Sequence, residues 1–312
     1  MSSSRVSIVI PTRNRSAFLA RAVEHAYLQN YFDLEVIVSD NNSTDDTNDV
    51  LKLLKLAYPD LVVVRHTTTI GIGHHWHTVV THYATGDYIL LIPDDDIIFD
   101  ASYISDAVNV FTSNTCVSLV FARYISVDRD DNILKTYLTQ WPTYISGTDL
   151  LKAYNNGHDR FVPHLTAVFR RSTYEKTLGF SCEFLSPDMF LWLQLLLLSD
   201  AYFFSHCVAK YMLHPGNLSR TIDPSLSLMD TKMIKVIREN YPYVLHDKFL
   251  TRHLSRIERY LYIRFHSAVA KQLFYNRSLS IRHLMHVKPF LFFFQYMPDV
   301  FARKVSSIVF GK

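Results

Sequence analysis

The chain has 312 residues, of which 48% are hydrophobic and 20% are charged, and its formal net charge is +3. At about 150 residues per domain, this length allows one large domain or two. The apolar fraction and the low glycine count of 8 exclude disordered, collagen-like and low-complexity chains. Cys116, Cys182 and Cys207 are far apart in sequence, so we expect neither a disulfide scaffold nor a structural zinc site.

The small net charge hides a split along the chain. Residues 248–312 hold 12 basic and 2 acidic residues, a charge of +10, whereas residues 1–247 carry −7. This asymmetry predicts that the C-terminal part meets an anionic surface, either a membrane or a nucleic acid. We expect no signal peptide, because Met1–Arg5 hold no apolar core, and no apolar run reaches the roughly 18 residues of a membrane span.

Residues 1–125 alternate between short β-branched runs and amphipathic segments with helical spacing. Beginning with a strand, the pattern predicts alternating strands and helices at Val6–Ile10, Ser16–Gln29, Glu35–Ser39, Asp45–Leu56, Leu61–Arg65, His75–Ala84, Tyr88–Ile92, Ala101–Phe111 and Val117–Ile125. Such alternation indicates βαβ units. We therefore expect an α/β fold in which a mostly parallel sheet lies between helices.

The pattern beyond residue 125 is less regular. We expect, in turn, an irregular stretch, a helix, a strand, an apolar helix and a strand at Asp128–Thr143, Gly147–Asn155, Leu165–Arg170, Asp188–Leu198 and Ala209–Leu213. Residues 224–312 have helical spacing almost throughout, interrupted by prolines. We place a domain boundary near Pro215–Pro224, which gives a first domain at 1–220 and a helical C-terminal region at 221–312.

Polar residues gather at the ends of the first four predicted strands. Pro11–Arg15 follow the first strand, Asp40–Thr47 the second and Pro93–Asp96 the fourth, and Gly71–Gly73 lie beyond the third. In open α/β sheets, ligands bind outside the carboxyl ends of the strands. We therefore expect one crevice that all four segments line.

The triplet Asp94–Asp96 is the most informative of these segments. Three adjacent carboxylates repel one another, and burying them is costly unless a cation neutralises them. Mg²⁺ or Mn²⁺ suits such oxygen ligands and usually shares its shell with substrate phosphates. The triplet therefore predicts a divalent metal site, and a solvated acidic turn that caps the next helix is the alternative.

Two common nucleotide-binding motifs are absent, and their absence limits the kinds of nucleotide chemistry expected. The chain has no Gly-x-x-x-x-Gly-Lys-[Ser/Thr] loop, and no Gly-x-Gly-x-x-Gly follows the first strand, which disfavours P-loop and dinucleotide chemistry. Asp40 and Asn41 are suited to hydrogen bonding a base or a ribose. The alternative is that Asp40–Thr47 is only a capped loop before the second helix.

Taken in order, these segments resemble a known family. The matching runs are Val6–Arg15, Glu35–Thr47, Gly86–Asp96, Phe169–Phe180, Pro187–Leu195 and Met212–Ser219. They resemble the family 2 glycosyltransferases of the GT-A fold, among them enzymes of bacterial surface-polysaccharide and O-antigen assembly. The resemblance covers about residues 5–220.

The resemblance implies roles for individual residues. Thr12 and Asn41 match contacts to the nucleotide base, and Asp40 lies beside them. The triplet matches the DxD motif, with Asp96 as the direct metal ligand and Asp94 near the ribose. The implied metal ligands are Asp94, Asp96 and His214, and the implied nucleotide-sugar site consists of Pro11, Thr12, Asn14, Arg15, Asp40, Asn41, Gly71, Asp94 and Asp95.

The resemblance also implies that Asp188 is the catalytic base. An acceptor hydroxyl reacts poorly until a base takes its proton, and Mn²⁺ or Mg²⁺ would stabilise the departing diphosphate. A single displacement would invert the anomeric centre. Two positions depart from the family pattern: Asn41 replaces an aspartate, and Ser186 stands where a glutamate usually precedes the base. Simple capping of the helix that starts near Pro187 is the alternative role of Asp188.

The basic C-terminal region interleaves Arg and Lys with aromatic residues, and Phe290–Phe301 is rich in phenylalanine. Aromatic side chains flanked by basic ones fit a helix in the membrane interface. A lid packed on the first domain and a nucleic-acid-binding segment are the alternatives. The resemblance argues against nucleic acid, because polyprenyl-linked acceptors lie at the membrane. Removal of about residues 285–312 should release the protein from a membrane pellet.

The expected function is transfer of a hexosyl or deoxyhexosyl group from a nucleotide-sugar to a glycan or polyprenyl-linked acceptor. The expected location is the cytoplasm, at the inner face of the membrane. A nucleotidyltransferase, a catalytically inactive sugar-nucleotide-binding protein and a nucleic-acid-binding protein are the alternatives. The first of these would use the same metal chemistry, and the third would show salt-dependent binding to DNA or RNA.

Overall fold

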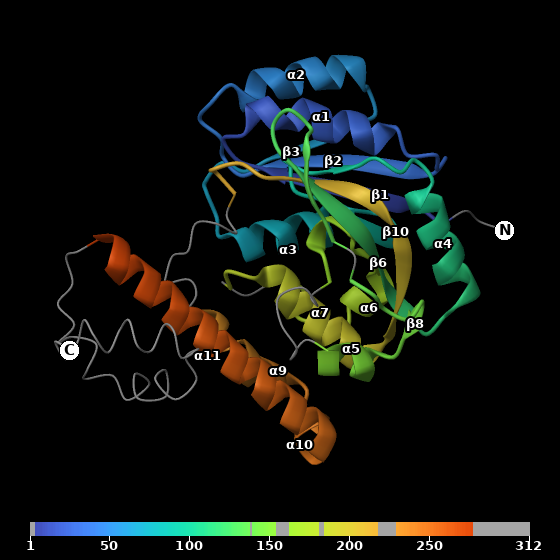
Figure 1. The fold of residues 1–312 in the computed structure, drawn as a ribbon. Coiled ribbons are helices and arrows are strands. Elements are labelled where there is room, and N and C mark those ends of the chain that lie inside the picture. Colours follow the sequence, from blue (N-terminus) through green and yellow to red (C-terminus); the bar gives the residue numbers. More distant parts are fainter. Residues whose placement is uncertain (1–3, 138, 154–161, 181–183, 218–228, 277–312) are drawn as a thin grey trace.

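The computed structural model describes residues 4–276 with gaps at 138, 154–161, 181–183 and 218–228, and it describes side chains as far as residue 262. The phenylalanine-rich segment predicted to meet a membrane, Phe290–Phe301, lies outside the described residues. Within the described part, the elements form a sheet covered by helices on both faces (Figure 1). The predicted α/β class, with a sheet between two layers of helices, is thus confirmed.

The sheet has ten strands in the order β3-β2-β1-β4-β9-β6-β10-β5, and β7 and β8 extend it from β6 and β10. β1 pairs in parallel with β2 and β4, β2 with β3, and β6 with β10. The strands are β1 (Val6–Thr12), β2 (Leu34–Asp40), β3 (Val62–Arg65), β4 (Tyr88–Leu91), β5 (Ile97–Ile98), β6 (Val117–Val127), β7 (Ile133–Thr136), β8 (Tyr144–Ile145), β9 (Val168–Arg170) and β10 (Asp200–Met212).

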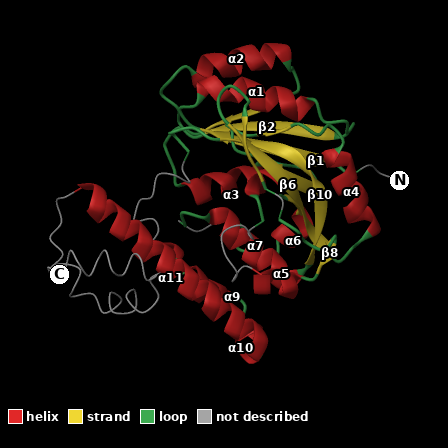
Figure 2. Cartoon of the chain, viewed as in Figure 1, coloured by secondary structure: helices red, strands yellow, loops and turns green. Residues whose placement is uncertain are grey.

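Helices form a layer on each face of this sheet (Figure 2). The described helices are α1 (Ser16–Tyr27), α2 (Thr47–Ala57), α3 (Ile72–His82), α4 (Tyr103–Ser113), α5 (Gly147–Ala153), the 3-10 turn η3 (His164–Thr166), α6 (Arg171–Tyr174), α7 (Pro187–Leu198), α9 (Met233–Asn240), α10 (Tyr243–His246) and α11 (Lys248–Asn276). One hydrophobic cluster unites one sheet face with α1, α2 and α4. A second cluster unites the other face with α3, α5, α7, α9 and α11.

β1 shows how the sequence builds both clusters. All seven of its residues are buried, as expected for a strand with helices on both sides. Side chains alternate across a strand. Ile8 and Ile10 therefore pack under α1, whereas Val9 packs toward α3. A continuous apolar run is what such a central parallel strand requires.

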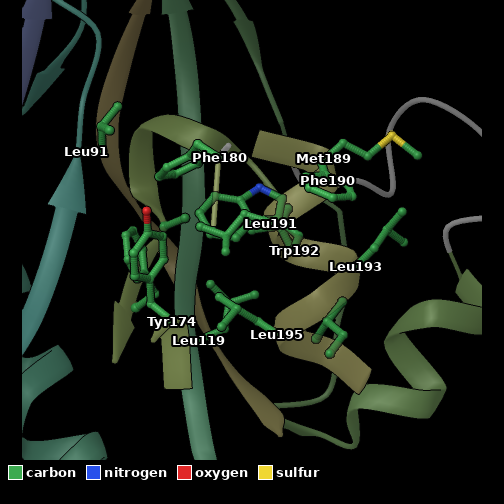
Figure 3. Packing of buried hydrophobic residues seen from close by; sticks show 14 of the residues in the cluster. Leu91, Leu119, Tyr174, Phe180, Met189, Phe190, Leu191, Trp192, Leu193 and Leu195 are labelled. Atoms are coloured by element: carbon green, nitrogen blue, oxygen red, sulfur yellow. The ribbon is translucent and has the colours of Figure 1, made fainter. Parts of the chain in front are cut away.

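α7 is the most deeply buried helix of the second cluster. Its run of Phe190, Leu191, Trp192 and Leu193 is apolar on every side of the helix, and each of these residues is 1% exposed or less. Figure 3 shows Trp192 beside Phe180, with Leu195 further along the helix. A helix that is apolar all round needs a cover on every side. The sheet covers one side, and α5 and the C-terminal helices cover others.

Several predicted elements differ from the observed ones in extent. The strand predicted at Leu165–Arg170 begins only at Val168, because residues 164–166 form the turn η3. The strand predicted at Ala209–Leu213 is the end of the 13-residue strand β10, which pairs with β6 along most of its length. The stretch predicted to be irregular, Asp128–Thr143, contains β7. Short strands that pair at sheet edges carry little local signal.

Candidate active site

The candidate site lies where β1, β2 and β4 end. β1 and β2 pair in register, so that Thr12 lies opposite Asp40, and β4 lies on the other side of β1. The backbone amide of Asn41 donates to the carbonyl of Thr12 at 2.9 Å. Three of the four polar segments expected at this edge are therefore neighbours in space.

The triplet Asp94–Asp96 forms the turn between β4 and β5, and its residues are only 3%, 6% and 1% exposed. Asp94 accepts a hydrogen bond from the Thr12 hydroxyl at 2.6 Å. Asp96 accepts one from the backbone amide of Met212 at 3.0 Å. The triplet is thus a buried carboxylate cluster, and the alternative of a solvated acidic turn is wrong.

Arg15 joins this cluster to the end of β10. Its guanidinium lies 3.2 Å from a carboxylate oxygen of Asp94 and 2.6 Å from one of Asp95. It also donates to the carbonyl of Gly216 at 2.8 Å. Because Arg15 directly precedes α1, this one side chain connects the loop after β1, the carboxylates and the segment after β10.

His214 and Asn217 approach Asp95 from that segment after β10. The same Asp95 oxygen that contacts Arg15 lies 2.9 Å from Nε2 of His214 and 3.2 Å from the amide nitrogen of Asn217. The amide of Gly216 donates to Nδ1 of His214, which places the imidazole proton on Nε2. Phe18 of α1 stacks on the imidazole, with ring centroids 4.7 Å apart. Both nitrogens of His214 are thus engaged, and its predicted metal role stays a prediction.

The carboxylates carry more negative charge than their neighbours neutralise. Burial raises the pKa of Asp94 to about 7, against the attraction of Arg15. Burial, with the charge of Asp95 added, raises the pKa of Asp96 well above its ordinary value. Burial acts to lower the pKa of Arg15, but Asp94 and Asp95 outweigh it and raise that pKa. A further positive charge would therefore stabilise this cluster.

The chemistry of the cluster suits a hard divalent cation, because carboxylate oxygens are the ligands that Mg²⁺ and Mn²⁺ prefer. Within the described residues, however, no three Asp, Glu, His or Cys side chains stand together as a ready metal-binding group. Arg15, His214 and the Met212 amide occupy carboxylate oxygens that a metal would need. The donor set fits a metal if those partners give way.

The side of the site predicted to meet the nucleotide base is held by internal hydrogen bonds. Asp40 is fully buried, and its carboxylate accepts from the Ser43 amide at 3.0 Å and from Arg65 at 3.2 Å. Asn41 bonds the backbone of Ile70 at both ends of its amide, at 2.8 and 3.0 Å. An aspartate at this position could only accept hydrogen bonds, whereas Asn41 both donates and accepts one. Asn41 is therefore suited to hold the chain just before Gly71, the residue that precedes α3.

Asn14 connects the loops after β1 and β2. It has a positive φ of 52°, a region that Asn tolerates better than most residues. Its side-chain carbonyl accepts a hydrogen bond from the Thr44 amide at 2.8 Å, and its backbone amide donates one to the Ser43 hydroxyl at 2.8 Å. Together with Pro11 at the end of β1, it shapes the rim of the site and leaves Arg13 exposed.

Asp188 lies in the first turn of α7, on the other side of the sheet from α1. It is half-buried, and within the described residues no hydrogen bond connects it to the Asp94–Asp96 cluster. The structure therefore brings together Thr12, Arg15, the triplet and His214 by direct contact, and it places Asp188 on a separate element. A carboxylate in a first helical turn is favoured by the helix dipole.

Sequence reasoning missed Asp230. This residue is 2% exposed, and its carboxylate accepts hydrogen bonds from the amides of Leu185 and Ser186 at 2.8 and 3.2 Å, and from the Ser186 hydroxyl at 3.0 Å. It therefore fixes the chain that leads into α7 and Asp188. An aspartate outside any motif resembles a surface residue, so the sequence held no signal that could have found it.

Comparisons with known proteins give the family of this chain. Residues 7–178, more than half of the chain, match the family described as Glycosyl transferase family 2. A GalNAc(5)-diNAcBac-PP-undecaprenol beta-1,3-glucosyltransferase of Campylobacter jejuni is 26% identical over 197 residues, 61% of this chain and 59% of its own length. Across the first curated relatives, the match spans between 20% and 59% of their length.

Two solved structures share the fold. TarS of S. aureus with UDP-GlcNAc has a TM-score of 0.62 at 12% identity, covering 93% of this chain and 79% of that one. A mannosyltransferase from Pyrobaculum calidifontis with GDP-Man and Mn²⁺ has a TM-score of 0.59 at 17% identity, covering 100% and 89%. With the GT-A fold shared and the family match spanning the carboxylate cluster, the chain belongs to glycosyl transferase family 2.

Proposed function

We propose that the protein moves a hexosyl or deoxyhexosyl group from a nucleoside diphosphate-sugar to a hydroxyl of a glycan or lipid-linked saccharide, with inversion. The observation that carries this proposal is the buried Asp94–Asp96 cluster, joined to Thr12 and Arg15 where parallel strands end. Two structural neighbours hold UDP-GlcNAc and GDP-Man, which supports a nucleotide-sugar donor.

The donor would lie along the edge formed by the loops after β1, β2 and β4. Asp40 and Asn41 stand on the base side, and Thr12 lies between them and Asp94. Pro11, Asn14 and Gly71 would shape the rim, and Asp95 would hold Arg15 beside the donor site until the donor binds. A guanidinium binds phosphate oxygens in the same two-pronged geometry in which it binds carboxylates.

We infer that Asp94 and Asp96 would hold Mn²⁺ or Mg²⁺, with His214 beside the ion. Such an ion, when bound, supplies Lewis-acid stabilisation to the departing nucleoside diphosphate. The Mn²⁺ of the mannosyltransferase neighbour supports this assignment. Arg15 would release the two carboxylate oxygens and turn to the diphosphate, so that it remains paired with negative charge.

Asp188 would act as the base. The acceptor oxygen forms a bond to the anomeric carbon, the bond from that carbon to the diphosphate breaks, and the hydroxyl proton passes to the Asp188 carboxylate. The half-buried position of Asp188 at the start of α7 supports access by an acceptor from outside the sheet.

Asp188→Asn should reduce transfer by at least about a hundredfold, because the amide cannot take a proton. Nucleotide-sugar binding should change little, since Asp188 has no contact with the donor side. Product formation from a radiolabelled nucleotide-sugar would be measured beside donor-induced thermal shift. Turnover that persists in this variant would remove Asp188 from the mechanism.

The glucosyltransferase relative from Campylobacter jejuni acts on an undecaprenol-linked saccharide, as its name states, and this supports a lipid-linked acceptor here. Surface-polysaccharide or O-antigen assembly at the cytoplasmic face of a membrane would supply such an acceptor. Within the described residues, no helix has both the length and the apolar character needed to cross a bilayer.

A thermal-shift panel tests the donor class most directly. The protein would be heated with UDP-, GDP-, TDP- and CDP-sugars, each with and without Mn²⁺. Stabilisation by one nucleotide-sugar that requires metal supports the proposal, and the absence of stabilisation by any of them contradicts it. Release of pyrophosphate from a nucleoside triphosphate would instead indicate a nucleotidyltransferase, and binding without turnover on any acceptor would indicate an inactive binding protein.

A further inference from the structure

His164 occupies the turn η3, directly before β9, at the centre of the sheet. This turn contacts β4, β5, β6 and β10, and β4 and β5 flank the carboxylate triplet. The imidazole lies flat against the indole of Trp76 on α3, with ring centroids 4.6 Å apart and an angle of 2° between the planes. Both imidazole nitrogens are buried, and neither has a hydrogen-bond partner among the described residues.

A second unpaired group lies next to this histidine. The indole nitrogen of Trp192 on α7 is also buried without a partner in the described part of the chain, and the centroid of its ring lies 6.2 Å from that of His164. Trp192 follows Asp188 by four residues on the same helix, which places both on one helical face. Three of the buried unpaired nitrogens in the described part of the chain thus gather beside the face of α7 that carries Asp188.

Electrostatics also connect His164 with Asp188. Burial lowers the pKa of His164, and the Asp188 carboxylate is close enough to act against that effect. The two side chains form no hydrogen bond in this structure. Hydrogen bonds between catalytic groups are often long or absent without substrate and shorten when the substrate binds.

Packing alone does not explain a histidine at this position. A buried polar atom without a partner is destabilising, whereas an apolar ring of the same shape would fill the space without that penalty. Phenylalanine would stack on Trp76 equally well. The polar atoms of His164 therefore point to a hydrogen bond that the described residues do not form in this structure.

We propose that His164 is a positioning residue for the transfer step: with acceptor bound, its ring N–H donates a hydrogen bond to one oxygen of Asp188 and so directs the other oxygen to the acceptor hydroxyl. The inference rests on the proposed role of Asp188 as base. His164 keeps its proton throughout, and the proton of the acceptor passes only to Asp188. Trp76 and Trp192 hold the ring in place.

The test compares His164→Phe with His164→Gln in the full chain. For His164→Phe we expect a free energy of unfolding equal to or above that of the unchanged protein and an unchanged nucleotide-sugar thermal shift. The kcat should fall by about tenfold to a hundredfold, with little change in the KM for the acceptor. His164→Gln retains an N–H donor and should recover part of the lost kcat.

His77→Phe provides the matched control, because His77 lies on α3 near Trp76 but has a partner, with Nδ1 2.9 Å from the Tyr174 hydroxyl. It should lower the stability and leave kcat unchanged. If His164→Phe keeps full kcat, or if it unfolds the protein and loses kcat in proportion, the role of His164 is refuted. If the unchanged protein neither binds nor transfers any nucleotide-sugar, the proposed function itself fails.

Discussion

Arg15 sets the charge balance of the carboxylate cluster. Its guanidinium occupies one oxygen of Asp94 and one of Asp95, and these are atoms that a divalent cation would also use. A cation and Arg15 therefore compete for the same negative charge. Arg15 and the two carboxylates are largely buried, so bulk salt screens this competition only weakly.

Arg15→Gln should strengthen the binding of Mn²⁺ to the nucleotide-free protein by about tenfold or more, since one competing positive charge is removed from a buried site. Transfer should nevertheless fall, because the proposed contact to the diphosphate is lost. Free Mn²⁺ would be measured by electron paramagnetic resonance during titration. Arg13→Gln, two positions earlier at an exposed residue, is the control and should leave the affinity unchanged. Weaker Mn²⁺ binding by Arg15→Gln would refute the competition.

His75 is a second residue whose protonation affects the site, in this case through the stability of the fold. It lies on α3 under the base-binding edge, and its Nε2 is 2.8 Å from the Ser39 hydroxyl. Burial, with the nearby charge of His66 added and Asp40 opposing, lowers the pKa of His75 to about 4. An unfolded histidine titrates near 6.5, so the unfolded state binds more protons between about pH 6.5 and 4.

The free energy of unfolding should therefore contain a His75 contribution that is complete above about pH 6.5 and is lost as the pH falls toward 4. Its upper limit is about 3 kcal/mol. His75→Gln keeps a donor toward Ser39 but does not titrate, so its stability should exceed that of the parent increasingly as the solution is acidified. Urea denaturation at pH 7, 6 and 5 would show this. A difference in unfolding free energy between parent and variant that stays constant across these pH values would be inconsistent with a buried, neutral His75.

The sequence predicted the individual residues of the site unevenly. Thr12, Arg15 and Asp94–Asp96 belong to contiguous runs at strand ends, and parallel pairing brings such ends together. Asp230 and His164 are isolated in the sequence, and their environments depend on packing between distant elements. Local patterns hold no information about such contacts.

At the scale of elements, the chain that leads into α7 is held in place by the C-terminal region. Asp230 accepts three hydrogen bonds from Leu185 and Ser186, just before the helix begins. The side chain of Ser186 forms no cap of its own on α7. Asp230 thus holds the two residues that precede Pro187, and through them it stabilises both the fold and the position of Asp188.

Asp230→Ala should reduce the free energy of unfolding by about 1–3 kcal/mol, because it leaves two buried amides without their acceptor. Transfer should fall as well, while donor binding at the far side of the sheet is retained. Chemical denaturation followed by circular dichroism measures the first effect. Asp49→Ala, at an exposed helical position, should change the stability by less than about 0.5 kcal/mol. Equal losses in the two variants would contradict this role of Asp230.

Element prediction succeeded for long periodic segments and failed for short paired ones. The alternation over residues 1–125 gave the βαβ order correctly, since each helix and strand there has its own apolar pattern. β9 has three residues and runs antiparallel between β4 and β6. No local signal distinguishes a parallel from an antiparallel partner strand. The antiparallel strand β9 between β4 and β6 could therefore not be predicted from the sequence.

For the molecule as a whole, the C-terminal helices are part of the same core as α7. Met233 and Ile237 of α9 and Leu254 of α11 are buried in the second cluster. Tyr241 donates from its hydroxyl to Gln194 of α7 at 3.1 Å. This packing favours the lid alternative for residues 229–262, and the predicted boundary at 220 stays a prediction, as does membrane contact by the segment beyond.

The exposed face of α11 still offers a basic surface. Arg252, Arg256 and Arg259 are spaced at four and three residues and are all exposed. Changing all three to Gln should weaken binding to vesicles of anionic phosphatidylglycerol by about a hundredfold, at roughly 1 kcal/mol for each basic residue near the surface. Binding would be measured by co-sedimentation, with phosphatidylcholine vesicles as the uncharged comparison.

A control variant with the same loss of charge separates local from overall electrostatics. Lys52→Gln and Lys55→Gln on α2, together with Lys176→Gln after α6, change exposed positions away from α11. This control should bind anionic vesicles like the parent. If the control and the α11 variant lose binding equally, or if neither loses it, α11 is not the surface that meets the membrane.

The contact between Asp230 and Ser186 has a consequence for how members of this family can exchange parts. A recombination event that joins residues 1–220 of this chain to the C-terminal region of a relative would place a foreign side chain against the segment that leads into α7. The helix that carries Asp188 and the segment around Asp230 are therefore expected to be inherited together. Acceptor preference would then travel with the C-terminal region, whereas the donor-binding loops after β1, β2 and β4 would be free to vary separately.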